Sequence, residues 1–225
     1  DFTRTNIDTA VQGAAFTVVG EIFPGEQNVI TSGYGALKDG VPVGGGTVQV
    51  YRGSNELHDW KKVQVFGPSA DIIFPNRPTV ADMDGDGDND IVVPSGYFFD
   101  TYPANPGGAK NRGAITWWEN RGLDAAGKPR TFVRHDVITG QGPSYHGVEL
   151  ADLDDDGITD IVTTAEAGKR SDDQFDDTVA LQFFKGRADR TFAPPVTLSA
   201  QGGSLPVVAD VDGDGWHGTM NYSGF

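Results

Sequence analysis

An acidic loop followed by a short β-branched strand recurs along this chain of 225 residues. Of all the features in the sequence, this repeat places the tightest limit on the fold. Two full copies span residues 81–93 (ADMDGDGDNDIVV) and 151–163 (ADLDDDGITDIVT), and a third copy begins at residue 209 (ADVDGDGW). The starting points are 70 and 58 residues apart, which indicates a structural unit of roughly 60 residues.

A fainter copy precedes the first acidic loop. Residues 19–34 hold the same place in the repeat, because Glu21 lies 61 residues before Asp82 and the tripeptide Ser-Gly-Tyr at 32–34 recurs at 95–97. Most of the acidic residues are missing from this copy. We therefore expect a repeat unit here that binds no metal.

The stretches between the loops also repeat, and they predict short strands. Alternating segments occupy 47–53, 114–120 and 179–186, strand-like segments follow at 60–63, 132–137 and 192–196, and short apolar pieces such as 78–81 and 205–209 lead to the next acidic loop. Each period thus holds about four strands and no helical periodicity.

Four antiparallel strands in a repeated unit are typical of a β-propeller blade. We predict an all-β fold with three to four such blades in a single domain or partial propeller, residues 1–225. The units are expected at about 16–80, 81–150 and 151–208, with an incomplete unit at 209–225. A β-sandwich and a β-solenoid remain alternatives, although a solenoid coil normally has a shorter period.

The spacing of the acidic residues predicts a site for a hard cation. Aspartates at loop positions one, three, five and nine can surround one ion together with the carbonyl of position seven, and glycine at position six permits the sharp turn. In the first loop the predicted ligands are Asp82, Asp84, Asp86, the carbonyl of Asp88, and Asp90. In the second loop they are Asp152, Asp154, Asp156, the carbonyl of Ile158, and Asp160.

The third loop offers a weaker or incomplete site. It contains Asp210, Asp212, Asp214 and the carbonyl of Trp216, but Gly218 stands where the last acid is expected. An EF-hand is excluded because strand residues follow each loop and no glutamate occupies position twelve. An all-oxygen site suits Ca²⁺ better than Mg²⁺, and the alternative is a solvated acidic turn without an ion.

Composition excludes several other classes of function. The chain has no cysteine, which rules out disulfides and thiolate chemistry, and its formal charge of −15 disfavours nucleic acid as a partner. No apolar run approaches the roughly 18 residues of a membrane span. Because the sequence begins at Asp1 without an initiator methionine, we expect a processed product or a fragment.

The pattern D-x-D-x-D-G-x-x-D followed by a β-branched strand resembles FG-GAP repeats, also called VCBS-type repeats, over residues 16–214. That resemblance implies a calcium-binding propeller like those of integrin α-chain heads, some fungal lectins, and several polysaccharide lyases or sugar dehydratases. Propellers of this family usually have about seven blades. The resemblance therefore implies that further chain or another subunit completes the ring, or that the architecture is smaller.

Few residues suggest catalysis. Tyr145 and His146, just before the second acidic loop, are the candidate acid–base pair for a lyase or dehydratase, and an ordinary surface turn is the alternative. Trp117 and Trp118 are adjacent on a predicted strand, so we expect them to face opposite sides. The segments 97–112 and 165–177 are candidate ligand-binding loops.

The sequence as a whole favours a secreted, calcium-stabilised propeller that binds carbohydrate or protein ligands through its loops. In this hypothesis the ions offset carboxylate repulsion and have no catalytic role. The alternatives are a carbohydrate lyase or dehydratase that uses Tyr145 and His146, and a passive structural repeat of a larger adhesion protein. Extracellular placement is expected from the resemblance and from loops suited to millimolar calcium.

Overall fold

The computed structural model describes residues 4–38, 41–42, 45–53, 59–69, 71–96, 113–139, 144–166, 180–200, 205–210 and 218–222. These residues form sixteen β-strands and no helix, so the all-β prediction is confirmed. Consistent with this, none of the described segments forms a helix that is long and apolar enough to cross a membrane.

The first sheet has four antiparallel strands in the order β1-β2-β5-β6. Its strands are β1 (Ala14–Gly20), β2 (Asn28–Gly33), β5 (Gly46–Arg52) and β6 (Lys61–Ser69). A small hairpin of β3 (Leu37–Lys38) and β4 (Val41–Pro42) is inserted between β2 and β5. The fainter copy of the repeat therefore forms a complete four-stranded sheet.

The second and third sheets repeat this antiparallel arrangement, and their strands follow one another in chain order. The second contains β7 (Thr79–Ala81), β8 (Asp90–Ser95), β9 (Ala114–Glu119) and β10 (Val133–Ile138). The third contains β11 (Ser144–Ala151), β12 (Asp160–Glu166), β13 (Ala180–Phe184) and β14 (Val196–Ser199). A further pair joins β15 (Leu205–Ala209) to β16 (Gly218–Tyr222).

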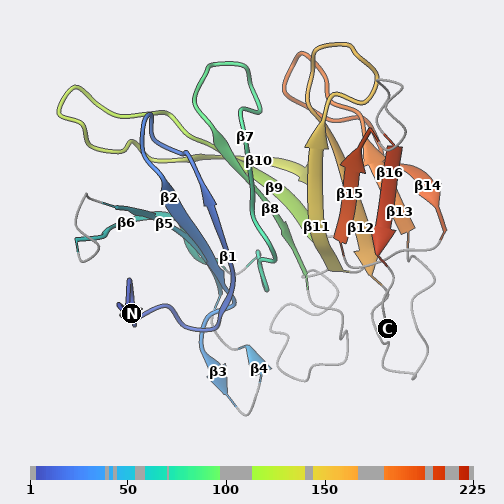
Figure 1. Ribbon diagram of the computed structural model, residues 1–225. Coiled ribbons are helices and arrows are strands. Elements are labelled where there is room, and N and C mark those ends of the chain that lie inside the picture. The colour runs from blue at the N-terminus through green and yellow to red at the C-terminus, as the bar shows by residue number, and fades with distance from the viewer. Residues whose placement is uncertain are drawn as a thin grey trace.

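The sheets stand side by side in a row, as the blades of a propeller do (Figure 1). The first strand of the third sheet lies at its junction with both neighbours, because β11 packs against β7 and β8 on one side and against β15 on the other. The Thr79 hydroxyl donates to the Val148 carbonyl at 3.1 Å, which ties β7 to β11. Within the described residues the row stays open and does not close into a ring.

The middle sheet is buried on both faces, which explains its nearly continuous apolar sequence. Ile91 and Val93 of β8 pack toward the first sheet, whereas Val92 packs toward the third. Trp118 stacks on Phe66 of the first sheet, with ring centroids 4.5 Å apart, whereas Trp117 belongs to the apolar cluster shared with the third sheet. The prediction that the two tryptophans face opposite sides is therefore confirmed, and both are buried.

One predicted strand is displaced. The segment 192–196 is expected to be a strand, but β14 begins only at Val196. Pro194 and Pro195 precede it and have no N–H to donate to a neighbouring strand, so regular pairing starts after them.

Candidate metal centre

The two acidic loops occupy equivalent hairpins. Residues 82–89 connect β7 to β8, and residues 152–159 connect β11 to β12, each joining the first and second strands of a sheet. Together with the β1–β2 hairpin they lie along the same edge of the row, at the top of Figure 1. The glycines at position six have positive φ, +93° at Gly87 and +81° at Gly157, as the turn prediction requires.

The first acidic loop (residues 82–90) gathers three carboxylates. One oxygen each from Asp82, Asp84 and Asp86 lies within 4.8 Å of the others. Backbone N–H groups hold this arrangement in place, because Asp82 accepts from Gly85 at 2.7 Å and from Gly87 at 3.0 Å. Three carboxylate oxygens at this separation could share one hard cation.

The second acidic loop (residues 152–160) has the same arrangement. Oxygens of Asp152, Asp154 and Asp156 lie within 4.8 Å of one another. The Asp152 carboxylate accepts from Gly157 N–H at 2.7 Å, which repeats the contact between Asp82 and Gly87 in the first loop. The structure thus brings together the ligands predicted at positions one, three and five of both loops.

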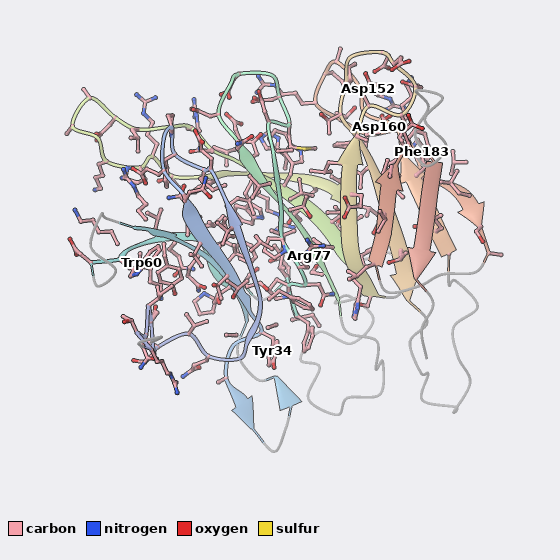
Figure 2. All side chains as sticks on the ribbon, in the orientation of Figure 1. Tyr34, Trp60, Arg77, Asp152, Asp160 and Phe183 are labelled. Atoms are coloured by element: carbon pink, nitrogen blue, oxygen red, sulfur yellow. The ribbon has the colours of Figure 1, made fainter. Side chains whose placement is uncertain are left out.

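The aspartate at position nine, Asp90 or Asp160, lies at the base of its loop and is fully buried. Figure 2 labels Asp160 together with Asp152, which is at position one of the same loop. The two oxygens of Asp90 accept N–H groups from Met83 at 2.9 Å and from Asn120 at 2.7 Å. Asp160 repeats this geometry with Leu153 at 3.0 Å and Gly186 at 2.8 Å. Position nine therefore joins the loop to the third strand of its own sheet, and its role as a metal ligand stays a prediction.

Burial and neighbouring negative charges raise the pKa of several carboxylates in these two loops. Burial raises the pKa of Asp90 to about 7, and the nearby charges of Asp84 and Asp86 raise it as well. The pKa of Asp160 and that of Asp84 are also raised, again chiefly by burial. A bound cation would stabilise the charged form of these groups and oppose the effect of burial.

Two basic side chains partly offset the acidic charge. Arg190, on the β13–β14 turn, places Nη1 2.9 Å from Oδ2 of Asp84 and so links the third sheet to the first acidic loop. Lys185 directly follows β13, and its Nζ contacts Asp154 and also Asp156, the latter at 2.9 Å. These contacts hold the pKa of Lys185 above its usual range.

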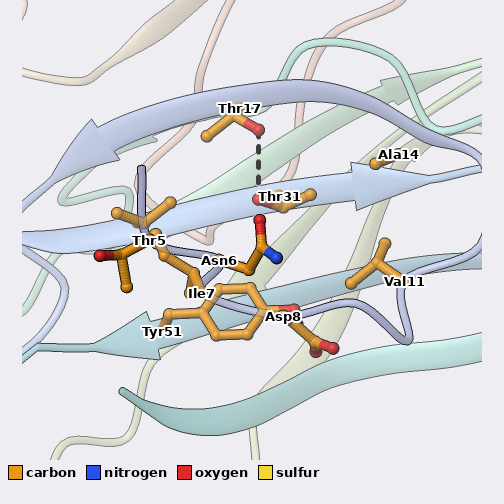
Figure 3. Close-up of a pocket in the computed structure, with 10 residues that line it drawn as sticks. Thr5, Asn6, Ile7, Asp8, Val11, Ala14, Thr17, Thr31 and Tyr51 are labelled. Carbon is orange, nitrogen blue, oxygen red and sulfur yellow. Dashed lines mark hydrogen bonds between the residues drawn. The ribbon is translucent and has the colours of Figure 1, made fainter. Parts of the chain in front are cut away.

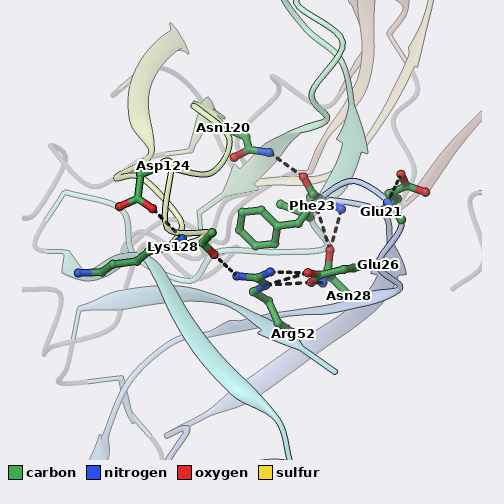
Figure 4. A network of polar contacts seen from close by, with 11 residues as sticks. Glu21, Phe23, Glu26, Asn28, Arg52, Asn120, Asp124 and Lys128 are labelled. Carbon is green, nitrogen blue, oxygen red and sulfur yellow. Dashed lines mark hydrogen bonds and ion pairs between the residues drawn. The ribbon is translucent and has the colours of Figure 1, made fainter. Parts of the chain in front are cut away.

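The β1–β2 loop (residues 21–28) uses the same connections without the acidic cluster (Figure 4). The Asn28 side chain takes the place of Asp90 and accepts from Ile22 N–H at 2.9 Å. Glu21 accepts from Gly25 N–H at 2.9 Å, as Asp82 does from Gly87. Arg52 pairs with Glu26, which lies two residues before Asn28 in this loop.

The remaining predicted ligands have different outcomes. The carbonyls of Asp88 and Ile158 belong to described residues, but nothing in the structure tests them as ligands. Asp210 follows β15 and is exposed. Asp212, Asp214 and Trp216 lie outside the described residues.

The structure does not favour the candidate catalytic pair. Tyr145 is 2% exposed and packs among Trp117, Ile161 and Phe184. Burial raises the pKa of its phenol to about 12, so proton transfer to a substrate would need a considerable rearrangement. His146 is partly buried beside it on β11. The loop candidate 97–112 lies outside the described residues, and so does the candidate 165–177 apart from residues 165 and 166, which end β12.

A separate hollow lies on the outer face of the first sheet (Figure 3). Its volume is about 300 Å³, and it lies between residues 5–11 and the strands β1, β2 and β5. The Tyr51 hydroxyl donates to Asp8 at 2.8 Å, and the hydroxyls of Thr17 and Thr31 are 3.2 Å apart. The lining therefore offers several hydroxyl groups and one carboxylate, that of Asp8.

The sequence-based predictions did not include the basic partners of the loops. The sequence holds a signal for two of these partners. Arg52 is the last residue of the alternating strand β5, and Lys185 directly follows β13, the equivalent strand of the third sheet. Aligning these strands would have placed both cations opposite the loops. Arg190 comes from a turn of the next sheet, and no repeat pattern indicates its contact with Asp84.

Comparison with family models and with curated proteins found no match. The three four-stranded sheets and the two acidic clusters therefore carry the functional argument.

Proposed function

We propose that this chain forms part of a calcium-stabilised β-propeller of the FG-GAP or VCBS type, which acts outside the cell as a binding module for carbohydrate or protein ligands. One observation carries the proposal: two equivalent hairpins of successive sheets each gather three aspartate oxygens within 4.8 Å. Like charges this close favour a hard cation between them, and an all-oxygen site suits Ca²⁺.

The position of the hairpins supports a structural role for the ions. The first acidic loop contacts the first sheet, where the Asn89 side chain donates to the Glu21 carbonyl at 2.8 Å, and the third sheet through Arg190. An ion in this loop would stabilise a junction of three sheets. The ligand-binding surface of such a module would then be held in place by calcium without contacting it.

The hollow on the first sheet supports carbohydrate as the ligand class. Sugars are bound through hydroxyl, amide and carboxylate groups placed beside apolar surface, and the hollow offers threonine hydroxyls, Asn6 and Asp8 next to Ile7 and Val11. Further chain or another subunit is proposed to continue the row of sheets.

Calcium binding is tested by elemental analysis and calorimetric titration, and by thermal unfolding in Ca²⁺ and in excess EDTA. We expect about two ions per chain and a clearly lower Tm in EDTA, because an ion that binds only the folded state stabilises it. The double variant Asp84→Asn/Asp154→Asn should lose both the binding and the EDTA effect. A melting curve that EDTA leaves unchanged, with no bound calcium, would contradict the proposal.

Ligand binding is tested on a glycan array in Ca²⁺ and in EDTA. Calcium-dependent binding of a defined glycan class supports the carbohydrate assignment. Absence of glycan binding by the calcium-loaded protein would direct the search to protein ligands.

A further inference from the structure

The residue opposite position nine differs in charge from sheet to sheet. In the first sheet Asn28 pairs with Arg52 across β2 and β5. In the second sheet Ile91 pairs with Trp118, so Glu119, the next residue of the third strand, lies opposite Asp90. In the third sheet Ile161 pairs with Phe184, so Lys185 lies opposite Asp160. Two of the three loops therefore face a basic residue, and the first acidic loop faces an acid.

In the first sheet the basic residue serves as the cation of the loop. The Arg52 guanidinium pairs with Glu26, with Nε 2.9 Å from Oε2, and its Nη1 donates to the Gly127 carbonyl of the neighbouring sheet at 3.3 Å (Figure 4). The loop has two acids, Glu21 and Glu26, and one tethered positive charge pairs with Glu26. A side chain at this position can therefore reach an acidic residue of the loop in the same sheet.

Lys185 makes the corresponding contact in the third sheet. Its ammonium bridges Asp154 and Asp156, two of the three carboxylates that gather in the second acidic loop. A group that is hydrogen-bonded to both carboxylates occupies oxygens that a metal ion would need. The second loop thus contains a positive charge that belongs to the protein.

The first acidic loop has no such occupant among the described residues. Glu119 adds a negative charge at the matching position, and its carboxylate pairs with His135 at 2.9 Å. Arg190 reaches this loop from outside and contacts a single oxygen, Oδ2 of Asp84. The other oxygen of Asp84 faces into the loop, where it accepts the Asp86 N–H at 3.2 Å. Within the described part of the chain, the three gathered carboxylates are therefore not bridged by a basic side chain.

We propose that Lys185 is a tethered counter-ion that competes with Ca²⁺ for Asp154 and Asp156, so that the first acidic loop fills at lower calcium concentration than the second. This inference rests on the proposed calcium binding. An ammonium and a divalent ion about 5 Å apart repel each other enough, even in a water-like dielectric, to change affinity by about tenfold. Arg190 repels an ion in the first loop in the same way, so the difference between the loops comes from Lys185 occupying oxygens of two gathered carboxylates where Arg190 contacts one. The protein would then have two calcium sites that fill at different calcium concentrations.

The test isolates each loop and measures calcium affinity by calorimetry. Asp86→Ala leaves only the second loop intact, and Asp156→Ala leaves only the first. We expect the protein with the first loop intact to bind Ca²⁺ more tightly. In the Asp86→Ala background, Lys185→Gln should tighten binding by about tenfold, whereas Lys185→Arg, which keeps the charge, should not. In the Asp156→Ala background, Glu119→Lys should weaken binding.

The outcomes separate this inference from the proposed function. Lys185 is 42% exposed, so Lys185→Gln should fold, and its circular dichroism spectrum should match that of the parent. If both loops bind calcium with equal affinity, or if Lys185→Gln leaves the second loop unchanged, the inference is wrong although the proposed function stands. If no variant binds calcium, the proposed function fails and the inference fails with it.

Discussion

Replacing Asp90 by asparagine tests whether the base of the first acidic loop carries a charge that the fold tolerates poorly without a cation. Asp90 is 1% exposed, and burial together with the charges of Asp84 and Asp86 raises its pKa to about 7. In the unfolded chain its pKa is near 3.9. The folded protein without metal therefore binds more protons than the unfolded protein between these two values, and Asp90 lowers its stability as the pH rises.

The pKa difference sets the size of the effect. A rise of about three units gives about 4 kcal/mol of stability that is present below pH 4 and lost by pH 7. An asparagine side chain has no charge to lose, so Asp90→Asn removes this contribution. The substitution also gives up one of two accepted N–H bonds, at a cost of about 1–3 kcal/mol that is independent of pH. The difference between variant and parent should therefore change by about 4 kcal/mol across this range.

The assay is urea unfolding at several pH values between 4 and 7.5, once in EDTA and once in millimolar calcium. In EDTA, Asp90→Asn should gain stability relative to the parent as the pH rises, because the parent alone becomes charged. In calcium the trend should shrink, since the ion favours the carboxylate. Asp88→Asn is the matched control, because it removes the same charge from the same loop at a side chain that is only partly buried.

A difference between Asp90→Asn and the parent that stays constant from pH 4 to pH 7 in EDTA would refute this reasoning. It would mean that Asp90 is solvated or already neutralised in the folded protein. A similar pH trend for Asp88→Asn would attribute the effect to the total charge of the loop and not to the buried position.

Two further predictions concern packing between the sheets, and both are measured by urea unfolding in calcium. Ile161→Ala should cost about 2–5 kcal/mol, because Ile161 is completely buried in the apolar cluster between the second and third sheets, whereas Val19→Ala, at a position 65% exposed, should stay within about 0.5 kcal/mol; equal effects would contradict this core. Asn120→Ala should cost about 1–3 kcal/mol, because its amide donates to the carbonyls of Ile22 at 2.7 Å and Asn89 at 3.2 Å, and the exposed Gln12→Ala should cost little; a neutral Asn120→Ala would mean that water replaces these bonds.

The sheet architecture could be predicted because it follows from local patterns. Alternation marks β5 and β9, and the run Ile91–Val92–Val93 marks a strand buried on both sides. The period shows that the same unit is built again. Where proline interrupts the pattern, as before β14, the strand begins later than predicted.

The metal loops were only partly predictable, because spacing does not distinguish a ligand from a structural acceptor. Position nine fits a calcium loop, and the structure also uses it to bind two backbone N–H groups at the base of the hairpin. That contact involves Asn120, thirty residues away, so it depends on how β8 pairs with β9. The bridge from Arg190 to Asp84 depends on how two sheets pack, which local sequence does not determine.

The first sheet shows which contacts form the hairpin when the acidic cluster is absent. Asn28 accepts the N–H group that follows Glu21, as Asp90 accepts the one that follows Asp82, and Glu21 accepts a glycine N–H as Asp82 does, although most of the acidic cluster is missing. The turn therefore forms from these two end positions, and the middle carboxylates are additional. Calcium would remove repulsion among those carboxylates and would not create the hairpin. The protein in EDTA should thus melt at lower temperature yet keep its β-sheet circular dichroism at about 25 °C, unlike a small zinc domain that unfolds without its metal.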